Sequence, residues 1–416
     1  MSIWDTDAME LRLFMEDLCC DISRFQHLAE GVPAENIRIR QDFDLGLPGA
    51  FADIRVTVPG ARPYFIEVKW TQESDEIVER VAAKYATLTP ATTDAAKVIV
   101  ASGLPECDGA RLASMLRDNV HPSLEIEVWG AAQVRELVRK YFQTEITGFG
   151  RKELTELRGA IEQVKGVYAF GETYSYSPAE ASLKWHFGCW TIHRLRQQPD
   201  YCETNVFRTG LYTDVATLMV DLSGFSSYVR DTRDQGVVQQ VLTSFYTKSR
   251  RAVIDHGGML YQFVGDAVIG VFGVPGVWPG YLDAAIECAA AIMDIGRSVS
   301  NKWQRLTDRV QPVAGCHTGI ALGDLLVVPL RSYSRSHIGL VADSVNMAAR
   351  LSAAAKPGEM VVSNALFQGL RHSTKHPFTP MEPIEAKNVG TLQAWKWDRD
   401  GTLTAHAMAA SSVPML

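Results

Sequence analysis

MLYQFVGDAVIGVF, residues 259–272, consists of two apolar runs on either side of the pair Gly265-Asp266, and each run is long enough for a β-strand. A Gly-Asp pair between two such runs is a signal for a tight two-residue hairpin turn. The stretch therefore predicts a β-hairpin with Asp266 at its tip. Gln262, the only amide side chain in the stretch, stands four residues before that aspartate.

A second aspartate stands near the end of the preceding strand-like run. DVATLMVDL, residues 214–222, predicts a strand that carries Asp221, and the SGFSS that follows predicts a turn whose free backbone N–H groups favour anions. If this strand neighbours the hairpin, Asp221 and Asp266 converge. Two carboxylates at adjacent strand ends can hold a pair of divalent cations, roughly 3.5–4 Å apart, that activate a nucleophile and hold a triphosphate. The alternative is a helix cap at Asp221 and a turn former at Asp266.

A helical segment further along carries an amide and a guanidinium at helical spacing. In VADSVNMAARL, residues 341–351, Asn346 and Arg350 are four residues apart and share one helix face. Such a pair suits stabilisation of charge on a transferring phosphate and orientation of a ribose oxygen. The alternative is an ordinary solvated helix face. In contrast, we expect His317, in GCHTG, to pack in a core strand.

The order of these patterns divides the chain into parts. Residues 1–142 alternate strand-like and helix-like stretches and predict an α/β domain, and 143–207 predict a helical connector. Residues 208–400 contain two βαβ-like units with the inserted hairpin, which predicts an α+β domain of ferredoxin-like type. Residues 401–416 are expected to form a tail.

Composition limits the classes of protein to consider. The chain of 416 residues is 46% hydrophobic and 21% charged, and its net charge of −7 argues against a general role in coating nucleic acid. The 7 cysteines are scattered without a zinc-type spacing, which is typical of a reducing cytoplasm. The sequence has no signal-peptide pattern and no run of about 18 apolar residues. We therefore expect a cytoplasmic protein without a membrane span.

Four segments, in this order, resemble the catalytic domain of class III nucleotidyl cyclases, the adenylate and guanylate cyclase family. They are VDLSGFSSY, GGMLYQFVGDAVIGVFG, GCHTGIALGD and ADSVNMAARL, and the resemblance covers roughly residues 208–398. It implies two divalent ions, Mn²⁺ or Mg²⁺, on Asp221 and Asp266, with the backbone carbonyl of Leu222 assisting. It also implies that the loop through Phe225 holds phosphates.

The resemblance implies a reaction and an assembly as well. Asn346 and Arg350 would orient the ribose and stabilise the transition state, and Lys387 in EAKNVG would bind the terminal phosphates. The 3′-hydroxyl would attack the α-phosphate to give a 3′,5′-cyclic nucleotide and pyrophosphate. Because the family builds its site from two catalytic domains and this chain carries both halves, the implied assembly is a homodimer with two equivalent sites.

The motifs above do not identify the base of the nucleotide substrate. Adenylate cyclases of the family carry a lysine four residues before the hairpin aspartate and an Asp or Thr seven residues before the helix asparagine, and this chain has Gln262 and Gly339 there. The flanking sequence is closer to the bacterial pyrimidine cyclases of Pycsar antiphage systems, which implies UTP as substrate, cyclic UMP as second messenger and a separate effector that it activates. Gln262 and Tyr261 would then contact the base, with Arg331 or Arg335 as further candidates. Cytidylate or adenylate cyclase activity is the alternative.

The N-terminal region carries a different set of candidate site residues. ADIRVTVPGARPYFIEVKW, residues 52–70, places Asp53 on one strand and Glu67 and Lys69 on one face of the next. This resembles the restriction-endonuclease-like fold with its PD-(D/E)xK motif, whose carboxylates hold a divalent ion and whose lysine assists the attacking water. It implies a nuclease-like site, a nucleic-acid-binding version of it, or a plain scaffold. A non-catalytic nucleotide-sensing regulator of an N-terminal nuclease is therefore a second hypothesis for the whole chain.

Overall fold

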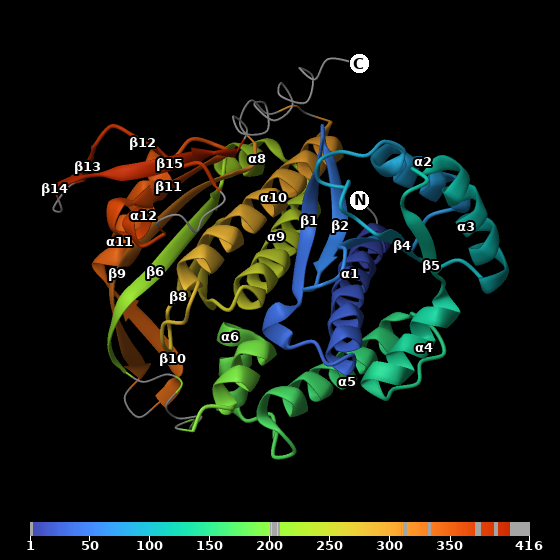
Figure 1. Ribbon diagram of the computed structural model, residues 1–416, viewed down its shortest axis with the longest axis horizontal. Coiled ribbons are helices and arrows are strands. Elements are labelled where there is room, and N and C mark those ends of the chain that lie inside the picture. The colour runs from blue at the N-terminus through green and yellow to red at the C-terminus, as the bar shows by residue number, and fades with distance from the viewer. Residues whose placement is uncertain are drawn as a thin grey trace. The chain divides into compact units, whose positions relative to one another are not determined.

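The computed structural model describes residues 3–199, 201, 206, 209–308, 310, 314–331, 334–370, 376–386 and 390–399. The chain divides into two compact units, Met1–Tyr174 and Ser175–Leu416. Each unit contains its own main β-sheet (Figure 1). The helical region expected between the two domains is divided, because α5 (Arg151–Phe170) belongs to the first unit and α6 (Pro178–Arg196) to the second.

Unit 1 is built on a mixed five-stranded sheet of order β1-β2-β3-β4-β5. The first three strands pair antiparallel and the last three parallel. The strands are β1 (Arg38–Leu47), β2 (Ala50–Thr57), β3 (Tyr64–Lys69), β4 (Lys97–Ser102) and β5 (Glu125–Trp129). Besides α5, the helices are α1 (Ile3–Ala29), α2 (Ser74–Tyr85), α3 (Glu106–Asn119) and α4 (Ala131–Phe142), with a short 3-10 turn, η1 (Ala34–Asn36).

Two hydrophobic clusters cover the two faces of this sheet. One joins α1, α4 and α5 to the sheet, and the other joins α2 and α3 to it. The side chains of β3 alternate between the two clusters, since Phe65 packs with the second cluster while Ile66 and Val68 pack with the first. Glu67 and Lys69 therefore lie on the same face as Phe65, the face that α2 covers.

Unit 2 contains an eight-stranded sheet of order β12-β15-β11-β9-β6-β8-β7, in which β10 pairs with β9. Its strands are β6 (Gly210–Leu222), β7 (Met259–Val264), β8 (Ala267–Phe272), β9 (Cys316–Arg331), β10 (Ser334–Val341), β11 (Glu359–Ser363), β12 (Thr379–Pro380) and β15 (Ala394–Asp398). A separate two-stranded sheet pairs β13 (Ile384–Ala386) with β14 (Gly390–Leu392). Besides α6, the helices are α8 (Phe225–Asp231), α9 (Gln235–Asp255), α10 (Tyr281–Thr307), α11 (Asp343–Ala354) and α12 (Asn364–Leu370). The predicted hairpin is confirmed as β7 and β8.

The two faces of the unit 2 sheet carry different helices. α9 and α10 lie side by side along one face, where Leu218 and Val220 of β6 join the large core cluster (Figure 1). On β6, Thr217 and Met219 have the opposite parity and contact α11 or the cluster around it. Because side chains alternate along a strand, Asp221 projects toward the face that α11 covers.

Gly319 of β9 lets α11 lie directly against the sheet. A Cβ atom at this position would lie 2.1 Å from the carbonyl oxygen of Ala348 and 2.2 Å from the amide nitrogen of Ser352. We expect Gly319→Ala to lower the free energy of unfolding of unit 2 by roughly 1–3 kcal/mol, because helix backbone must move. The control is Gly323→Ala on the same strand, whose Cβ would lie 3.4 Å from Ser344 Cβ. Urea unfolding of both variants measures this, and equal losses would contradict the packing argument.

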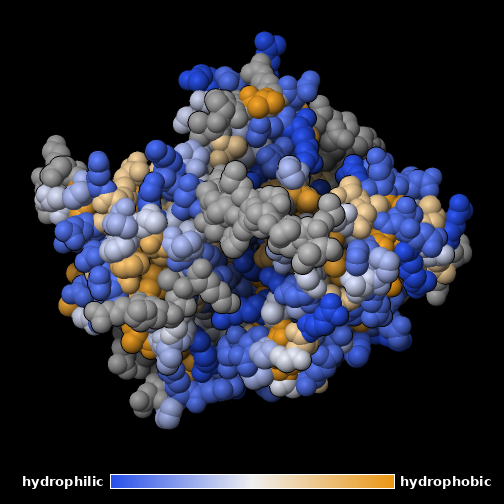
Figure 2. Space-filling view, turned by 45° about the horizontal axis from the view of Figure 1, so that its top comes forward, coloured by the Kyte–Doolittle hydropathy of each residue, from blue (hydrophilic) through white to orange (hydrophobic). Residues whose placement is uncertain are grey.

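None of the helices that the structure describes is long and apolar enough to cross a membrane. On the face in view in Figure 2, hydrophilic and hydrophobic side chains are interspersed. Five cysteines, Cys19, Cys20, Cys189, Cys288 and Cys316, are buried and form no disulfide.

Candidate active site

The two aspartates meet at one end of the unit 2 sheet. Asp221 of β6 pairs with Ala267, the first residue of β8, and Asp266 occupies the turn directly before it. Gly265 has a φ of 61° and Asp266 has no positive φ, as in a type II′ turn with glycine at its first central position. The two carboxyl groups lie close enough for each to shift the pKa of the other. The predicted convergence of Asp221 and Asp266 is therefore present.

The environment shifts the pKa values of the two carboxyl groups in opposite directions. Partial burial and the neighbouring charge of Asp221 raise the pKa of Asp266 to about 7. Burial also opposes the charge of Asp221, but hydrogen bonds from His317 and from the Asp266 carboxyl outweigh it and lower the pKa of Asp221. One carboxyl is therefore ionised at neutral pH while the other is poised to bind either a proton or a cation.

His317 lies beside these two carboxyl groups. The predicted core strand is confirmed, since His317 belongs to β9, but its side chain is not fully buried. It stands directly opposite Asp221 in the β6–β9 ladder, so both side chains project from the same face. Its Nε2 lies 3.4 Å from Asp221 Oδ2, and its Nδ1 lies 3.0 Å from Ser223 Oγ. The side chain is 21% exposed, which a core histidine would not be. Only the strand register, which the sequence does not give, could have identified it.

The residues present at this end of the sheet fit divalent cations. Asp221 Oδ1 is buried and receives no hydrogen-bond donor from the described residues, and the Asp266 carboxyl beside it is held partly protonated. Two adjacent carboxylates with an unused oxygen are suited to a hard cation such as Mg²⁺ or Mn²⁺, which takes further oxygen ligands from water, backbone and substrate phosphates. Leu222, the proposed carbonyl ligand, is the last residue of β6 and follows Asp221 directly. Because the described residues contain no group of three or more His, Cys, Asp or Glu side chains that could hold a metal ion, a cation here would depend on those further oxygen ligands.

The raised pKa of Asp266 predicts a pH dependence of stability without metal. Between about pH 4 and its folded pKa of about 7, Asp266 keeps a proton that the unfolded chain has lost, so the folded state loses stability as the pH rises through this range. The lowered pKa of Asp221 acts in the opposite direction and at more acidic pH. In a metal chelator, Asp266→Asn should therefore gain in melting temperature relative to the wild type as the pH rises from about 4.5 to 7.5. A constant difference across this range would contradict the pairing of the two carboxyl groups.

Phe225 opens α8, three residues after Leu222, the last residue of β6. Its ring packs edge-on against Trp303 of α10, with ring centroids 5.9 Å apart. Gly224 before it has a φ of 75° and turns the chain into the helix. Because the ring packs against the core, the contact that Phe225 can offer a ligand is its backbone.

Asn346 and Arg350 lie on one face of α11, as the spacing predicts. The buried residues of α11 are Ser344, Ala348, Leu351 and Ser352, and the helix turns Asn346 and Arg350 to the side opposite these. Asn346 is exposed, and Arg350 is half-buried with an Nη1 atom that has no hydrogen-bond partner among the described residues. The pair therefore faces away from the sheet that carries Asp221 in the same chain.

The residues expected to contact the base lie on β7 and β10. Gln262 is exposed, and the hydroxyl of Tyr261 accepts a hydrogen bond of 3.3 Å from the backbone N–H of Leu340. Gly339 pairs with Val328 in the β9–β10 ladder. Lys387 and the side chains of Arg331 and Arg335 lie outside the residues that the structure describes.

Unit 1 brings Asp53, Glu67 and Lys69 together, as the sequence predicts. Lys69 Nζ lies 2.6 Å from Asp53 Oδ2 and 2.7 Å from Glu67 Oε2. The two carboxylates are 4% and 0% exposed, so their charges need compensation within the protein. Burial alone would raise the pKa of Asp53, but the charges of Lys69, Lys84 and Arg12 lower it well below its usual range.

Both carboxylates of this cluster are already fully engaged by other side chains and the backbone. Lys84 Nζ lies 2.6 Å from Glu67 Oε2, and the Tyr85 hydroxyl donates to Glu67 Oε1 over 2.8 Å. Arg12 donates to Asp53 Oδ1 over 3.3 Å, and Val68 N donates to Asp53 Oδ2 over 2.8 Å. Because each carboxylate oxygen has a donor and three cations surround the pair, the arrangement does not fit a divalent ion in addition.

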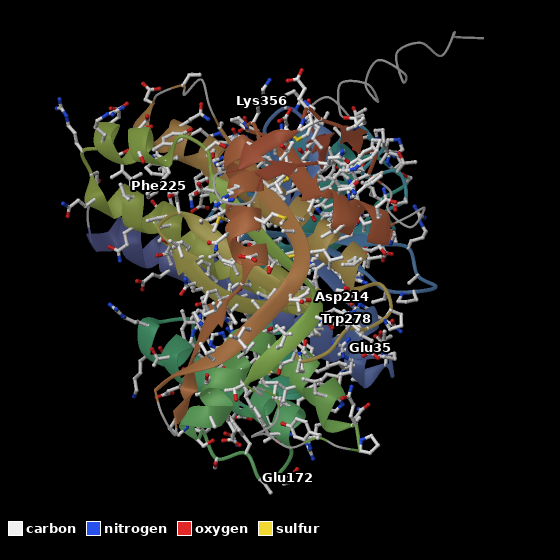
Figure 3. The ribbon with its side chains drawn as sticks, turned by 90° about the vertical axis from the view of Figure 1, so that its left-hand side faces the viewer. Glu35, Glu172, Asp214, Phe225, Trp278 and Lys356 are labelled. Atoms are coloured by element: carbon white, nitrogen blue, oxygen red, sulfur yellow. The ribbon has the colours of Figure 1, made fainter. Side chains whose placement is uncertain are left out.

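A cavity of about 550 Å³ lies at the opposite end of β6 from Asp221. Its lining includes Arg194, Tyr212 and Trp278, and the Arg194 guanidinium lies 5.0 Å from the centre of the Trp278 ring. In Figure 3, Trp278 is well separated from Phe225. The cavity is therefore distinct from the carboxylate site.

Comparison with known proteins places the aspartates in a recognised domain. Residues 208–398 match the family model described as the adenylate and guanylate cyclase catalytic domain. The uncharacterized protein Rv1320c of Mycobacterium tuberculosis is 30% identical over 157 residues, which are 37% of this chain and 26% of that protein. The uncharacterized protein Rv1318c of the same organism is 29% identical over 151 residues, 36% of this chain and 26% of that protein. The chain thus spans about a quarter of the length of these curated relatives.

Among solved structures, the guanylyl cyclase Cya2 is 22% identical, with a TM-score of 0.41, over 46% of this chain and 94% of that one. The adenylyl cyclase CyaB from P. aeruginosa is 18% identical, with a TM-score of 0.40, over 46% of this chain and 95% of that one. The family match covers all four segments that resemble the cyclases, together with Asp221, Asp266, Asn346 and Arg350. Residues 208–398 of this mixed α+β protein are therefore a catalytic domain of the class III adenylate and guanylate cyclase type.

Proposed function

We propose that the protein is a pyrimidine nucleotide cyclase, which converts UTP into 3′,5′-cyclic UMP and pyrophosphate with two divalent metal ions. The observation that carries the cyclase reaction is the meeting of Asp221 and Asp266 at one end of the sheet, inside the matched domain. When bound, the metal ions would polarise the α-phosphate and lower the pKa of the 3′-hydroxyl. The protein's own part is to hold the two carboxylates and to offer Arg350 to the developing charge.

The preference for a pyrimidine rests on the residues that would contact the base. Gln262 is exposed on the hairpin that ends in Asp266, and Gly339 on β10 has no side chain to read a purine. An amide both donates and accepts hydrogen bonds, so it can pair with the edge of uracil. The same amide can pair with cytosine, and we favour UTP on the resemblance to Pycsar cyclases.

A direct assay tests the substrate. The full-length protein with Mn²⁺ is given each of the four ribonucleoside triphosphates separately, and cyclic product and pyrophosphate are quantified by chromatography. We expect cyclic UMP to form fastest. Turnover of ATP alone would refute the pyrimidine preference, and no turnover of any nucleotide would refute the cyclase function.

The proposal includes a homodimer in which each site takes the aspartates of one copy and Asn346 and Arg350 of the other. What supports it is the direction of α11, which turns Asn346 and Arg350 away from the sheet of their own chain. The second-messenger role, with a separate effector activated by the cyclic nucleotide in antiphage defence, rests on the Pycsar resemblance alone. Measurement of cyclic UMP in cells before and after phage infection tests that role.

For unit 1 we propose a scaffolding role without cleavage of nucleic acid. The proposal rests on the compensation of Asp53 and Glu67 by Lys69, Lys84 and Arg12. Incubation of the full-length protein with DNA and RNA in Mg²⁺ tests it. Cleavage that disappears in Asp53→Asn would instead establish a nuclease, and binding without cleavage would establish a nucleic-acid-binding unit.

A further inference from the structure

One hydrogen bond joins α6 to the strand that leads to Asp266. His186 of α6 donates from Nδ1 to the backbone carbonyl of Leu260 on β7, over 2.6 Å. Because a carbonyl only accepts, Nδ1 carries the proton in this contact. Burial lowers the pKa of His186, so the ring is neutral at neutral pH and its donor is kept. Leu260 and its neighbours in β7 belong to the hairpin that carries Asp266.

β7 contains a β-bulge directly after Leu260. Leu260 pairs with Gly270 and Gln262 pairs with Ile269, so Tyr261 is an extra residue in β7. Leu260 and Phe263 both pack with the large core cluster although they are three residues apart, which a regular strand would not allow. The bulge therefore places Tyr261 and Gln262, the two residues between them, on the same side of the sheet, away from α9 and α10.

The bulge also fixes where the Tyr261 side chain lies. From this position its hydroxyl accepts the N–H of Leu340, next to Gly339 on β10. A regular β7 would turn either Tyr261 or Gln262 toward the core, and the two could not face a base together. The Leu260 carbonyl, at the edge of the irregularity, is bound by His186.

Contacts with α9, β7 and β10 fix the position of α6, the helix that carries His186. The helix breaks at Gly188, whose φ of 69° and ψ of 166° are not helical and beside which Ile254 packs. Arg250 of α9 donates to the carbonyl oxygens of Lys184 and Trp185 over 2.8 and 3.2 Å, which satisfies carbonyl groups left open where the first half of the helix ends. α6 also contacts β7 and β10 directly.

We propose that His186 is a positioning residue for nucleotide selection, which holds the bulge of β7 so that Tyr261 and Gln262 face the base together. This inference rests on the proposed function, because it assigns the base contact to these two residues. His186 would act through the Leu260 carbonyl rather than by contact with the nucleotide. Its removal should therefore change affinity and selectivity for the base more than the rate of cyclisation.

The test compares His186→Leu with His186→Asn in the full-length protein. Asparagine can place an amide donor near the position of Nδ1, whereas leucine cannot donate. We expect His186→Leu to raise KM for UTP about 3- to 10-fold and to lower the ratio of kcat/KM for UTP to that for ATP by a similar factor. The kcat for UTP should change less, and His186→Asn should restore most of the loss. His193→Leu, on the second half of α6, is the matched control and should leave KM and the ratio unchanged.

A second measurement does not depend on turnover. Hydrogen–deuterium exchange of the metal-free protein should become faster in peptides covering residues 259–264 and 339–341 in His186→Leu, but not in His193→Leu. A merely structural loss would lower kcat through the folded fraction and leave KM and the nucleotide ratio unchanged. Unchanged KM, ratio and local exchange would overturn the inference even if the wild type is an active cyclase. A wild type without any turnover would refute the proposed function, and exchange would still decide whether His186 holds the bulge.

Discussion

Replacing either Asp221 or Asp266 with asparagine is expected to reduce formation of cyclic nucleotide by about 10³-fold or more. Metal-ion stabilisation of the reacting phosphate contributes several kcal/mol to such a reaction, and each 1.36 kcal/mol corresponds to tenfold in rate. Asparagine keeps the shape and one carbonyl oxygen but removes the charge that holds the cation. Cyclic product formed in Mn²⁺ with the preferred nucleotide is the measurement.

The matched control for these variants is Asp214→Asn, on the same strand. Asp214 lies near the other end of β6, is exposed and has a φ of 56°, a conformation that asparagine also adopts readily. Its backbone oxygen accepts a hydrogen bond from Tyr281, which the substitution keeps. We expect wild-type activity from this variant. Retention of more than about a tenth of wild-type activity in Asp221→Asn or Asp266→Asn would contradict the assignment of the carboxylates as metal ligands.

Replacing Arg350 with alanine is expected to lower kcat by about 10²- to 10³-fold, which is the size of effect seen when one group that stabilises transition-state charge is removed. The Arg350 guanidinium is half-buried, and the Nη1 atom has no hydrogen-bond partner among the described residues, which suits this role. Lysine at this position should restore only part of the rate, because it cannot make the planar two-point contact of a guanidinium. Lys356→Ala, which removes an exposed cation just beyond α11, is the control and should be close to wild type.

Mixing two inactive variants tests whether two copies share the site. In a 1:1 mixture of Asp266→Asn and Arg350→Ala, half of randomly formed dimers contain one copy of each, and one of their two sites is then intact. Activity should return to about a quarter of the wild-type value. If the mixture stays inactive while both variants still associate, the residues act within one chain and the shared site is refuted.

The local patterns of the sequence predicted several parts of the site correctly. The alternating strand of 214–222, the Gly-Asp turn and the four-residue spacing of Asn346 and Arg350 all depend on contacts within a few residues, which the pattern itself encodes. The same holds for Glu67 and Lys69 on one face of β3. Residues chosen on these grounds were found where the sequence placed them.

Contacts across the sheets could not be predicted in this way. His317 reaches Asp221 because β6 and β9 pair in one particular register, and a shift of one residue would turn it to the other face. Lys84 and Arg12 compensate the unit 1 carboxylates from two helices far apart in the sequence. That network is the basis for our proposal that Asp53 and Glu67 form a closed set of ion pairs rather than a metal site.

The stretch MLYQFVGDAVIGVF therefore determined by itself that a hairpin forms and that Asp266 lies at its tip, because apolar runs and a Gly-Asp turn act locally. It did not determine which side of the sheet Gln262 faces. That depends on the bulge at Tyr261, where Leu260 and Phe263 both pack into the core and His186 binds the Leu260 carbonyl. Contacts with other elements decide where such an extra residue sits, because the apolar run alone does not show at which residue the alternation of side chains is interrupted.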